Sequence, residues 1–404
     1  MRSAVPLRAG TSAPAAYDAS VTAPTAQRER LVALDVFRGL TIAGMLLVNN
    51  PGTWGAIYPP LRHATWHGWT PTDLIFPFFL FIVGITTHLS LAARRTRGDD
   101  EGALLRQVLR RGGIIILLGL LLSGFPFLPK YGFDPSTMRF PGVLQRIGVA
   151  YIAAGLLTLR TSTRAQVVIV TALLLGYWAV MTLIPVPGTG ALGAVALATP
   201  DGSIAAWLDR TVLGNHLWRQ SKTWDPEGIL STLPAIGTAM LGVFAGRWIA
   251  SPRPLMDRIA ALFAVGALAM VAGLIWNWWF PINKNLWTSS YVLFTAGMAC
   301  VTIATCIWLI DVQRITGWTK PFVIFGMNPI LAFVGSGMMA RLMGSIIKVE
   351  RDGQSVSLQS AIYDSAFASW LSPMNASLLY AVCFVALWFV ILGVLYKRKV
   401  FLKV

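Results

Sequence analysis

The sequence contains ten apolar runs, each long enough to cross about 30 Å of hydrocarbon as an α-helix. Lipid offers the backbone no hydrogen-bond partner, so a chain can enter a bilayer only if its backbone bonds are satisfied internally, as they are in a helix. The sequence therefore predicts an all-α, polytopic transmembrane helix bundle. The ten runs lie near residues 31–50, 72–93, 112–129, 143–159, 166–186, 229–249, 258–279, 289–310, 321–343 and 375–396.

The composition agrees with a membrane protein, because 55% of the residues are hydrophobic and only 12% are charged. A formal net charge of +16 would suggest nucleic-acid binding if the basic residues formed a stripe with interleaved aromatic side chains. They lie instead between the apolar runs, so we expect the lipid bilayer, and no nucleic acid, as a partner. Cys300, Cys306 and Cys383 lie within apolar runs and are expected to be packing residues.

The distribution of Lys and Arg predicts the orientation, because basic residues in short loops resist translocation. With the N-terminus inside, the inner segments carry 21 of these residues and the outer loops carry 9. We predict a multi-pass protein of a bacterial-type inner (plasma) membrane, with both termini cytoplasmic and loops 51–70, 187–228 and 344–374 outside. Residues 1–27 lack the apolar stretch of a signal peptide and are predicted to be a disordered cytoplasmic tail, which leaves 28–404 as a single transmembrane domain.

Polar residues mark both ends of the first apolar run. Asp35 and Arg38 are three positions apart, so on a helix they share a face near the inner end. They either form a structural ion pair or contact an anionic cofactor that approaches from the cytoplasm. Asn49 lies at the outer end, where its amide either terminates the helix or offers hydrogen-bond donors to a cavity.

Two histidines and one acid follow in the first outer loop. His63 and His67 are four apart, a spacing that on a helix would put both imidazoles on one face and could suggest a metal site. Supporting carboxylates are scarce nearby, so we expect no metal. Asp73 lies in the stretch TPTD, which is typical of a helix start, and it either caps that helix or orients a catalytic imidazole.

Three further stretches carry polar side chains within or beside apolar runs. Arg146 lies inside the run 143–159. Asn283, Lys284 and Ser289 lie in a short connection, where they either clamp phosphate or carbonyl oxygens or cap helices and snorkel. Asn328 precedes a proline inside a run, which indicates either a broken helix lining a cavity or a simple kink.

Six motifs are spread over the chain after residue 28. In order, they are LDVFRGLTIAGMLLVNNPG, LRHATWHGWTPTDLIFPFFLFIVG, GVLQRIGVAY, DPEGILSTLPAI, PINKNLWTSSYVLFTAGM and GMNPILAF. Together they resemble the heparan-α-glucosaminide N-acetyltransferase family of membrane acetyltransferases, in its prokaryotic branch. The resemblance implies transfer of the acetyl group of cytoplasmic acetyl-CoA across the membrane onto the amine of a glucosamine-like sugar outside.

The resemblance also implies roles for particular residues. The family's catalytic histidine falls on His63, with Asn49 and Asp73 matching the other two polar positions of its site. The donor's nucleotide end or arm is then expected to contact residues chosen from the polar stretches above, namely Arg38, Arg146, Lys284, Asn283, Ser289 and Asn328. No metal is expected.

Two mechanisms and two rival functions remain open from the sequence. We favour direct transfer, in which His63 takes the proton of the attacking amine and Asn49 donates to the oxyanion, over a route through an acetylated His63. A secondary transporter of sugars or amino sugars is one rival, and an O-acetyltransferase of envelope polysaccharide is the other. A homodimer is left open.

Overall fold

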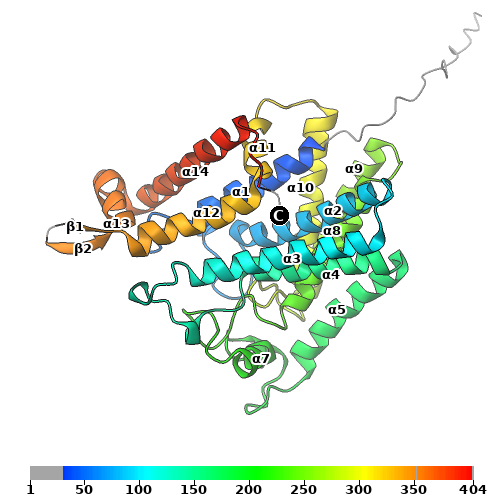
Figure 1. Ribbon diagram of the computed structural model, residues 1–404. Coiled ribbons are helices and arrows are strands. Elements are labelled where there is room, and N and C mark those ends of the chain that lie inside the picture. Colours follow the sequence, from blue (N-terminus) through cyan, green and yellow to red (C-terminus); the bar gives the residue numbers. More distant parts are fainter. Residues whose placement is uncertain (1–30, 352, 403–404) are drawn as a thin grey trace, which may run out of the picture. The chain divides into compact units, whose positions relative to one another are not determined.

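The computed structural model describes residues 31–351 and 353–402, and the predicted tail 1–27 lies outside them. The described part is a bundle of long helices with shorter elements at their ends (Figure 1). The α-helices are α1 (Val32–Asn49), α2 (Ile75–Arg95), α3 (Glu101–Gly124), α4 (Val143–Arg160), α5 (Thr163–Leu183), α6 (Gly193–Leu197), α7 (Ile204–Leu213), α8 (Thr232–Ile249), α9 (Leu255–Trp276), α10 (Ser289–Ile307), α11 (Thr319–Met327), α12 (Pro329–Arg341), α13 (Leu358–Tyr363) and α14 (Pro373–Lys397).

Short 3-10 and π turns flank or extend these helices, and two strands form a hairpin. The 3-10 turns are η1 (Pro59–Leu61), η2 (Pro71–Leu74), η3 (Pro129–Tyr131) and η4 (Pro135–Thr137). The π turns are η5 (Trp308–Val312), η6 (Leu342–Ile346) and η7 (Asp364–Ala368). The strands are β1 (Lys348–Arg351) and β2 (Gln354–Ser357), which pair antiparallel with Lys348 opposite Ser357.

Each predicted run corresponds to helix in the structure, and eight helices within the described residues are long and apolar enough to cross a membrane. The fold class of a mostly helical polytopic bundle is therefore confirmed. The small β1–β2 hairpin and α13 are additions that lie together in the predicted loop 344–374 (Figure 1). The long loop 187–228 contains α6 and α7, which the sequence did not predict as helices.

The run 112–129 was placed too late in the chain. The structure begins α3 at Glu101 and ends it at Gly124. Asp100 caps its start by accepting a hydrogen bond from the backbone N–H of Ala103 at 3.1 Å. Hydropathy missed the first turns because Arg106 and its neighbours are basic, although Arg is a good helix former.

The run 321–343 is not one continuous helix. Asn328 has non-helical backbone angles and separates α11 from α12, which starts with Pro329. Proline lacks an N–H and clashes with the preceding turn, so it suits the first position of a new helix. The break that the proline indicated is therefore present.

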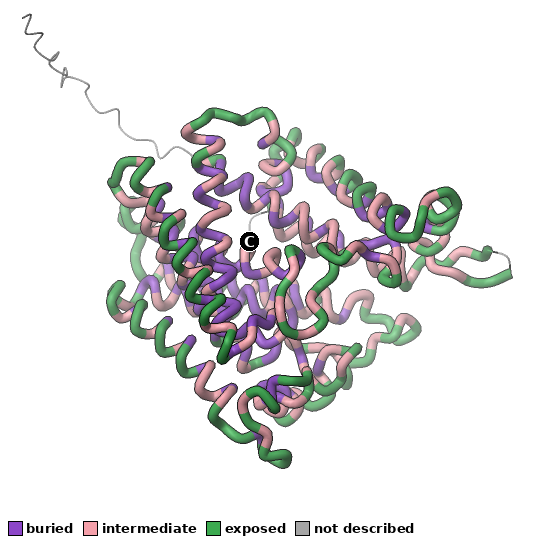
Figure 2. Tube along the Cα trace, turned by 180° about the vertical axis from the view of Figure 1, so that it is seen from behind, coloured by how far each residue is buried: buried purple, intermediate pink, exposed green. Residues whose placement is uncertain are grey.

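Helix α8 lies within the bundle and packs against α2, α4, α5 and α10. Its approach to α2 depends on Gly84, where a Cβ atom would lie 1.9 Å from the carbonyl oxygen of Ala239. Figure 2 shows buried positions concentrated in the middle of the bundle and exposed positions on its outer helices. The predicted run 229–249 corresponds to α8, which is not among the eight candidate spans.

Contacts between helix ends show which loops share one end of the bundle. Arg95 at the end of α2 donates to Leu159 near the end of α4, and Arg160 pairs with Glu101 at the start of α3. Arg247 at the end of α8 donates to Gln166 at the start of α5. Each contact therefore joins the ends of two different helices, and the predicted cytoplasmic segment 94–111 lies against the end of α4.

Candidate active site

The irregular segment 50–70 is held against two other connections. The indole N–H of Trp66 donates to the carbonyl of Leu197 at 2.8 Å, and the backbone N–H of Gly68 donates to the carbonyl of Ile282 at 2.8 Å. The segment contains prolines and glycines and is not helical around the histidines. These contacts join the histidine segment to α6 and to the connection 277–288.

His63 contacts the carboxylate of Asp73, ten residues further along. Its Nδ1 lies 2.6 Å from Asp73 Oδ1. The carboxylate is buried, with 1% of the side chain exposed, whereas 45% of the His63 side chain is exposed. A carboxylate accepts hydrogen bonds, so the contact favours the proton on Nδ1 and leaves the Nε2 lone pair available to an external group.

The second oxygen of Asp73 holds the chain around it. Oδ2 accepts hydrogen bonds from the backbone N–H groups of Ala64 and Thr70, both at 3.0 Å. The phenol of Tyr291 donates to the Asp73 carbonyl at 2.5 Å. The two predicted roles of Asp73 are thus compatible in geometry, because one oxygen holds the start of the helix and the other contacts the imidazole.

Lys284 lies against the same imidazole. Its Nζ is 3.2 Å from both ring nitrogens of His63 and 3.9 Å from Asp73 Oδ1. An in-plane approach at equal distances from both nitrogens would collide with the carbon between them, so the ammonium lies over the ring face. Burial lowers the pKa of Lys284, against the opposing effects of Asp73 and Glu227.

His67 has different surroundings, so the two histidines do not form one face. Its Nδ1 lies 3.4 Å from the amide nitrogen of Asn283, and its ring is next to Trp66. Burial lowers the pKa of His67. The helical spacing that suggested a metal site does not apply, because both histidines lie in irregular chain. Within the described residues, no group of three or more His, Cys, Asp or Glu side chains is arranged to hold a metal ion.

Arg146 lies deep in the bundle at the same end as His63. Only 2% of the residue is exposed, and its guanidinium lies 5.1 Å from the ring of Trp287. Nη2 donates to Ser231 Oγ at 2.5 Å. Its Nε and Nη1 are buried and have no hydrogen-bond partner among the described residues, so they remain available to a ligand or to water.

A buried ion-pair network adjoins this site, and no sequence pattern predicts it. Arg139 contacts Asp225 and Glu227, each at 2.5 Å. Although burial would raise it, Arg139, Arg146 and Lys284 hold the pKa of Glu227 below its ordinary value. The partners are 86 and 88 positions apart in the chain, so no local spacing could have indicated the network.

Four other predicted residues are not joined to His63 by any contact among the described residues. Arg38 donates to the Gly326 carbonyl at 3.1 Å and pairs with Asp35 at 3.3 Å. Asn49 is exposed at the end of α1. The two others have backbone partners: Ser289 donates to the Leu174 carbonyl, and Asn328 binds the carbonyl of Val400 and the N–H of Leu402. Ser289 and Asn328 therefore have structural partners, and a contact of either with the donor stays a prediction.

The profile of the family described as "Heparan-alpha-glucosaminide N-acetyltransferase, catalytic" matches residues 30–273. The proteins named heparan-alpha-glucosaminide N-acetyltransferase from Homo sapiens and Mus musculus are each 31% identical to this chain, over 431 and 425 residues. Both alignments cover 93% of this chain and 60% of the relative, so the chain spans about three fifths of the length of these relatives.

Proposed function

Because the chain belongs to the heparan-alpha-glucosaminide N-acetyltransferase family, we propose that it is a transmembrane acetyltransferase that uses acetyl-CoA as donor and the amine of a glucosamine-like sugar as acceptor. The observation that carries the proposal is the cluster of His63, Asp73 and Lys284. A partly exposed imidazole backed by a buried carboxylate is the arrangement that general-base catalysis requires.

The proposed reaction is a direct acyl transfer. His63 Nε2 takes a proton from the sugar amine while the amine nitrogen attacks the thioester carbon. The new C–N bond forms, the C–S bond breaks, and the thiolate of CoA leaves. Asp73 holds the Nδ1 proton and stabilises the imidazolium that forms. All these groups come from one chain, so the proposed chemistry needs no partner subunit.

Lys284 and Asn49 are the candidates for stabilising the negative charge of the tetrahedral intermediate. The ammonium of Lys284 lies beside the imidazole that receives the proton, so it is close to where the acyl group must be held. Asn49, to which the favoured direct-transfer mechanism gives this task, lies at the exposed end of α1, and its amide has no hydrogen-bond partner among the described residues. Lys284 has the stronger support from the contacts, and we propose it as the principal electrostatic group.

Arg146 is the best-supported contact for the arm of the donor. Its two buried donors without a hydrogen-bond partner among the described residues suit amide or carbonyl oxygens, which pantetheine carries, and Asn283, which contacts His67, is a further amide that we propose for the donor. Arg38 belongs to the end of the bundle where α1 begins and where the nucleotide of a cytoplasmic donor would enter. We propose a plasma-membrane orientation with that end cytoplasmic and His63 facing the outside.

The proposal is tested with purified full-length protein in detergent. Labelled acetyl-CoA is incubated with glucosamine and other amino sugars, and the product is identified by mass. The expected result is an N-acetylated sugar in equal amount to the CoA released. The proposal would be contradicted if acetyl-CoA neither stabilised the protein nor released CoA. Transport of amino sugars into vesicles by the same protein would then support a transporter. Retention of label on the protein would instead indicate the acetyl-histidine route.

A further inference from the structure

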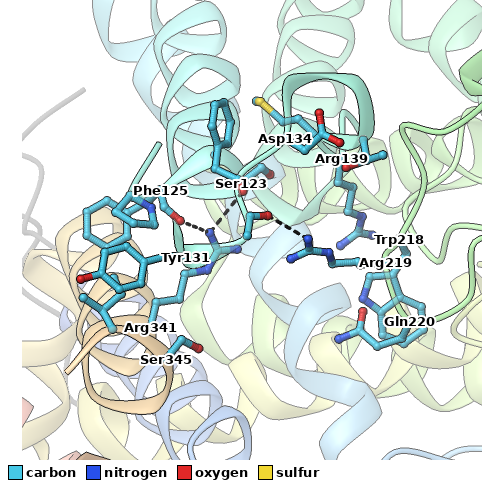
Figure 3. Close-up of a pocket in the computed structure, with 17 residues that line it drawn as sticks. Ser123, Phe125, Tyr131, Asp134, Arg139, Trp218, Arg219, Gln220, Arg341 and Ser345 are labelled. Carbon is cyan, nitrogen blue, oxygen red and sulfur yellow. Dashed lines mark hydrogen bonds between the residues drawn. The ribbon is translucent and has the colours of Figure 1, made fainter. Parts of the chain in front are cut away.

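A cavity of about 430 Å³ lies between three parts of the chain, and His63 is not among the residues that line it. The α3–α4 connection contributes residues 123–139, the segment 218–220 contributes a second wall, and Arg341 with residues 345–346 contributes the third. Figure 3 shows Arg219 and Arg341 entering from different walls with their guanidinium groups facing each other.

Both guanidiniums are fixed in position by neutral backbone groups. Nη1 of Arg341 donates to the carbonyls of Leu122, Ser123 and Phe125, at the C-terminal end of α3. Nη2 of Arg219 donates to the Gly132 carbonyl at 2.8 Å. Gly132 has a φ of +80°, and a Cβ there would lie 3.3 Å from Arg219 Nη1, so glycine suits both the turn and the guanidinium.

These carbonyls orient the two arginines without neutralising them. The third arginine of the lining, Arg139, is compensated by Asp225 and Glu227. Asp134 is the acidic lining residue, its Oδ1 accepts two hydrogen bonds from Ser136, and its carboxylate attracts the guanidinium of Arg219. Arg219 and Arg341 act on each other as like charges and, among the described residues, form no ion pair within 4.0 Å. With Arg139 already paired, two guanidinium groups stand against the one carboxylate of Asp134, so the lining keeps an excess of one positive charge.

We propose that this cavity is a binding site for a phosphate-type oxyanion, held between Arg219 and Arg341. Guanidinium groups present several donors in a plane and bind phosphate oxygens in pairs. Trp218 and Tyr131 also line the cavity, so it offers aromatic faces next to the anion site, and these suit a sugar ring that carries the phosphate. The site goes beyond the proposed transferase activity and is separate from the His63 cluster.

The experiment measures binding and not turnover, so its outcome is independent of the proposed activity. Purified full-length protein is titrated with glucose 6-phosphate, inorganic phosphate and glucose, and the thermal midpoint is recorded. Arg219→Gln is compared with Lys222→Gln, which removes one positive charge three positions away outside the cavity lining. Arg341 is left intact because it holds the end of α3. A parallel series uses phosphatidylcholine nanodiscs with and without phosphatidylglycerol.

Glucose 6-phosphate should stabilise the unchanged protein and Lys222→Gln, with binding about tenfold weaker in Arg219→Gln. Glucose should have no effect. If inorganic phosphate alone stabilises the protein, and Arg219→Gln removes the effect, the site binds free phosphate. If phosphatidylglycerol alone does so, and Arg219→Gln removes the effect, the site binds a lipid phosphate. No stabilisation by any phosphate, or equal stabilisation of Arg219→Gln, would overturn the proposal.

Discussion

The carboxylate of Asp73 serves two sets of neighbours, one with each oxygen. Oδ2 accepts hydrogen bonds from the backbone N–H groups of Ala64 and Thr70, while Oδ1 contacts His63. An exposed loop is thereby tied to a buried anion. The position of the imidazole and its tautomer depend on the same residue, so a change at Asp73 is expected to affect both.

Asp73→Asn should retain the fold and acetyl-CoA binding but lower turnover by about a hundred- to ten-thousandfold. An amide has only one acceptor oxygen, so if that oxygen keeps the loop N–H groups, the NH₂ group faces His63 and favours the wrong tautomer. The measurement is the rate of CoA release at saturating substrates. Asp99→Asn, the same change in an exposed segment, serves as the control. A loss of less than threefold in Asp73→Asn would contradict the assignment.

Lys284→Met should reduce kcat by about a hundred- to a thousandfold with little change in the KM for acetyl-CoA. Methionine keeps much of the side-chain volume and removes the charge beside the imidazole. Lys348→Met, in the exposed strand β1, is the matched control. If KM for acetyl-CoA rises and kcat is unchanged, Lys284 contacts the donor and does not act on the reacting group.

At the scale of elements, α7 and the segment before α8 are joined through one buried acid. Asp209 Oδ1 accepts a hydrogen bond from the backbone N–H of Ile229 at 2.9 Å, and only 2% of the residue is exposed. Burial, with Asp225 nearby, raises the pKa of Asp209 from 3.8 to about 6. The folded protein therefore binds this proton at a higher pH than the unfolded chain does.

It follows that Asp209 lowers stability as pH rises from about 4 to 6, because the folded state then gives up a proton that it binds more tightly than the unfolded state. Asp209→Asn keeps an acceptor for Ile229 and cannot ionise. As pH rises from about 4 to 6, the unfolding free energy of the variant should increase relative to that of the unchanged protein by on the order of 2 kcal/mol. Thermal midpoints of both proteins are compared at several pH values from 4 to 7. A difference that does not change with pH would contradict the prediction.

The helices could be predicted from the sequence because a span needs a long apolar run, and the break before α12 could be predicted from Pro329. The start of α3 could not be predicted from hydropathy because its first turns are basic. The hydrogen bond between His63 and Asp73 joins residues ten apart and is one of the two roles of Asp73 that the sequence leaves open. Lys284 is 221 positions from His63, and only packing brings them together.

At the scale of the whole molecule, the account requires opposite ends of the bundle to face opposite sides of the membrane. Cysteines introduced at the exposed positions Thr96 and Ala198, in a Cys383→Ala background, should react with an impermeant reagent from opposite sides. The cysteine at position 96 should react only after the cells are lysed. The cysteine at position 198 should react in cells whose outer membrane alone has been permeabilised. Labelling of both from the outside would contradict the predicted orientation.

The central claim is that His63 is the general base, and the most direct measurement compares His63→Ala with His67→Ala. His67 is the best control because it is an imidazole four residues away whose contact is Asn283 and not Asp73. Each variant is assayed for transfer of labelled acetyl groups to an amino sugar and, separately, for acetyl-CoA binding. The account predicts that His63→Ala binds acetyl-CoA and loses about two to four orders of magnitude in transfer, while His67→Ala keeps most of its activity. Full activity in His63→Ala, or equal losses in both variants, would contradict it.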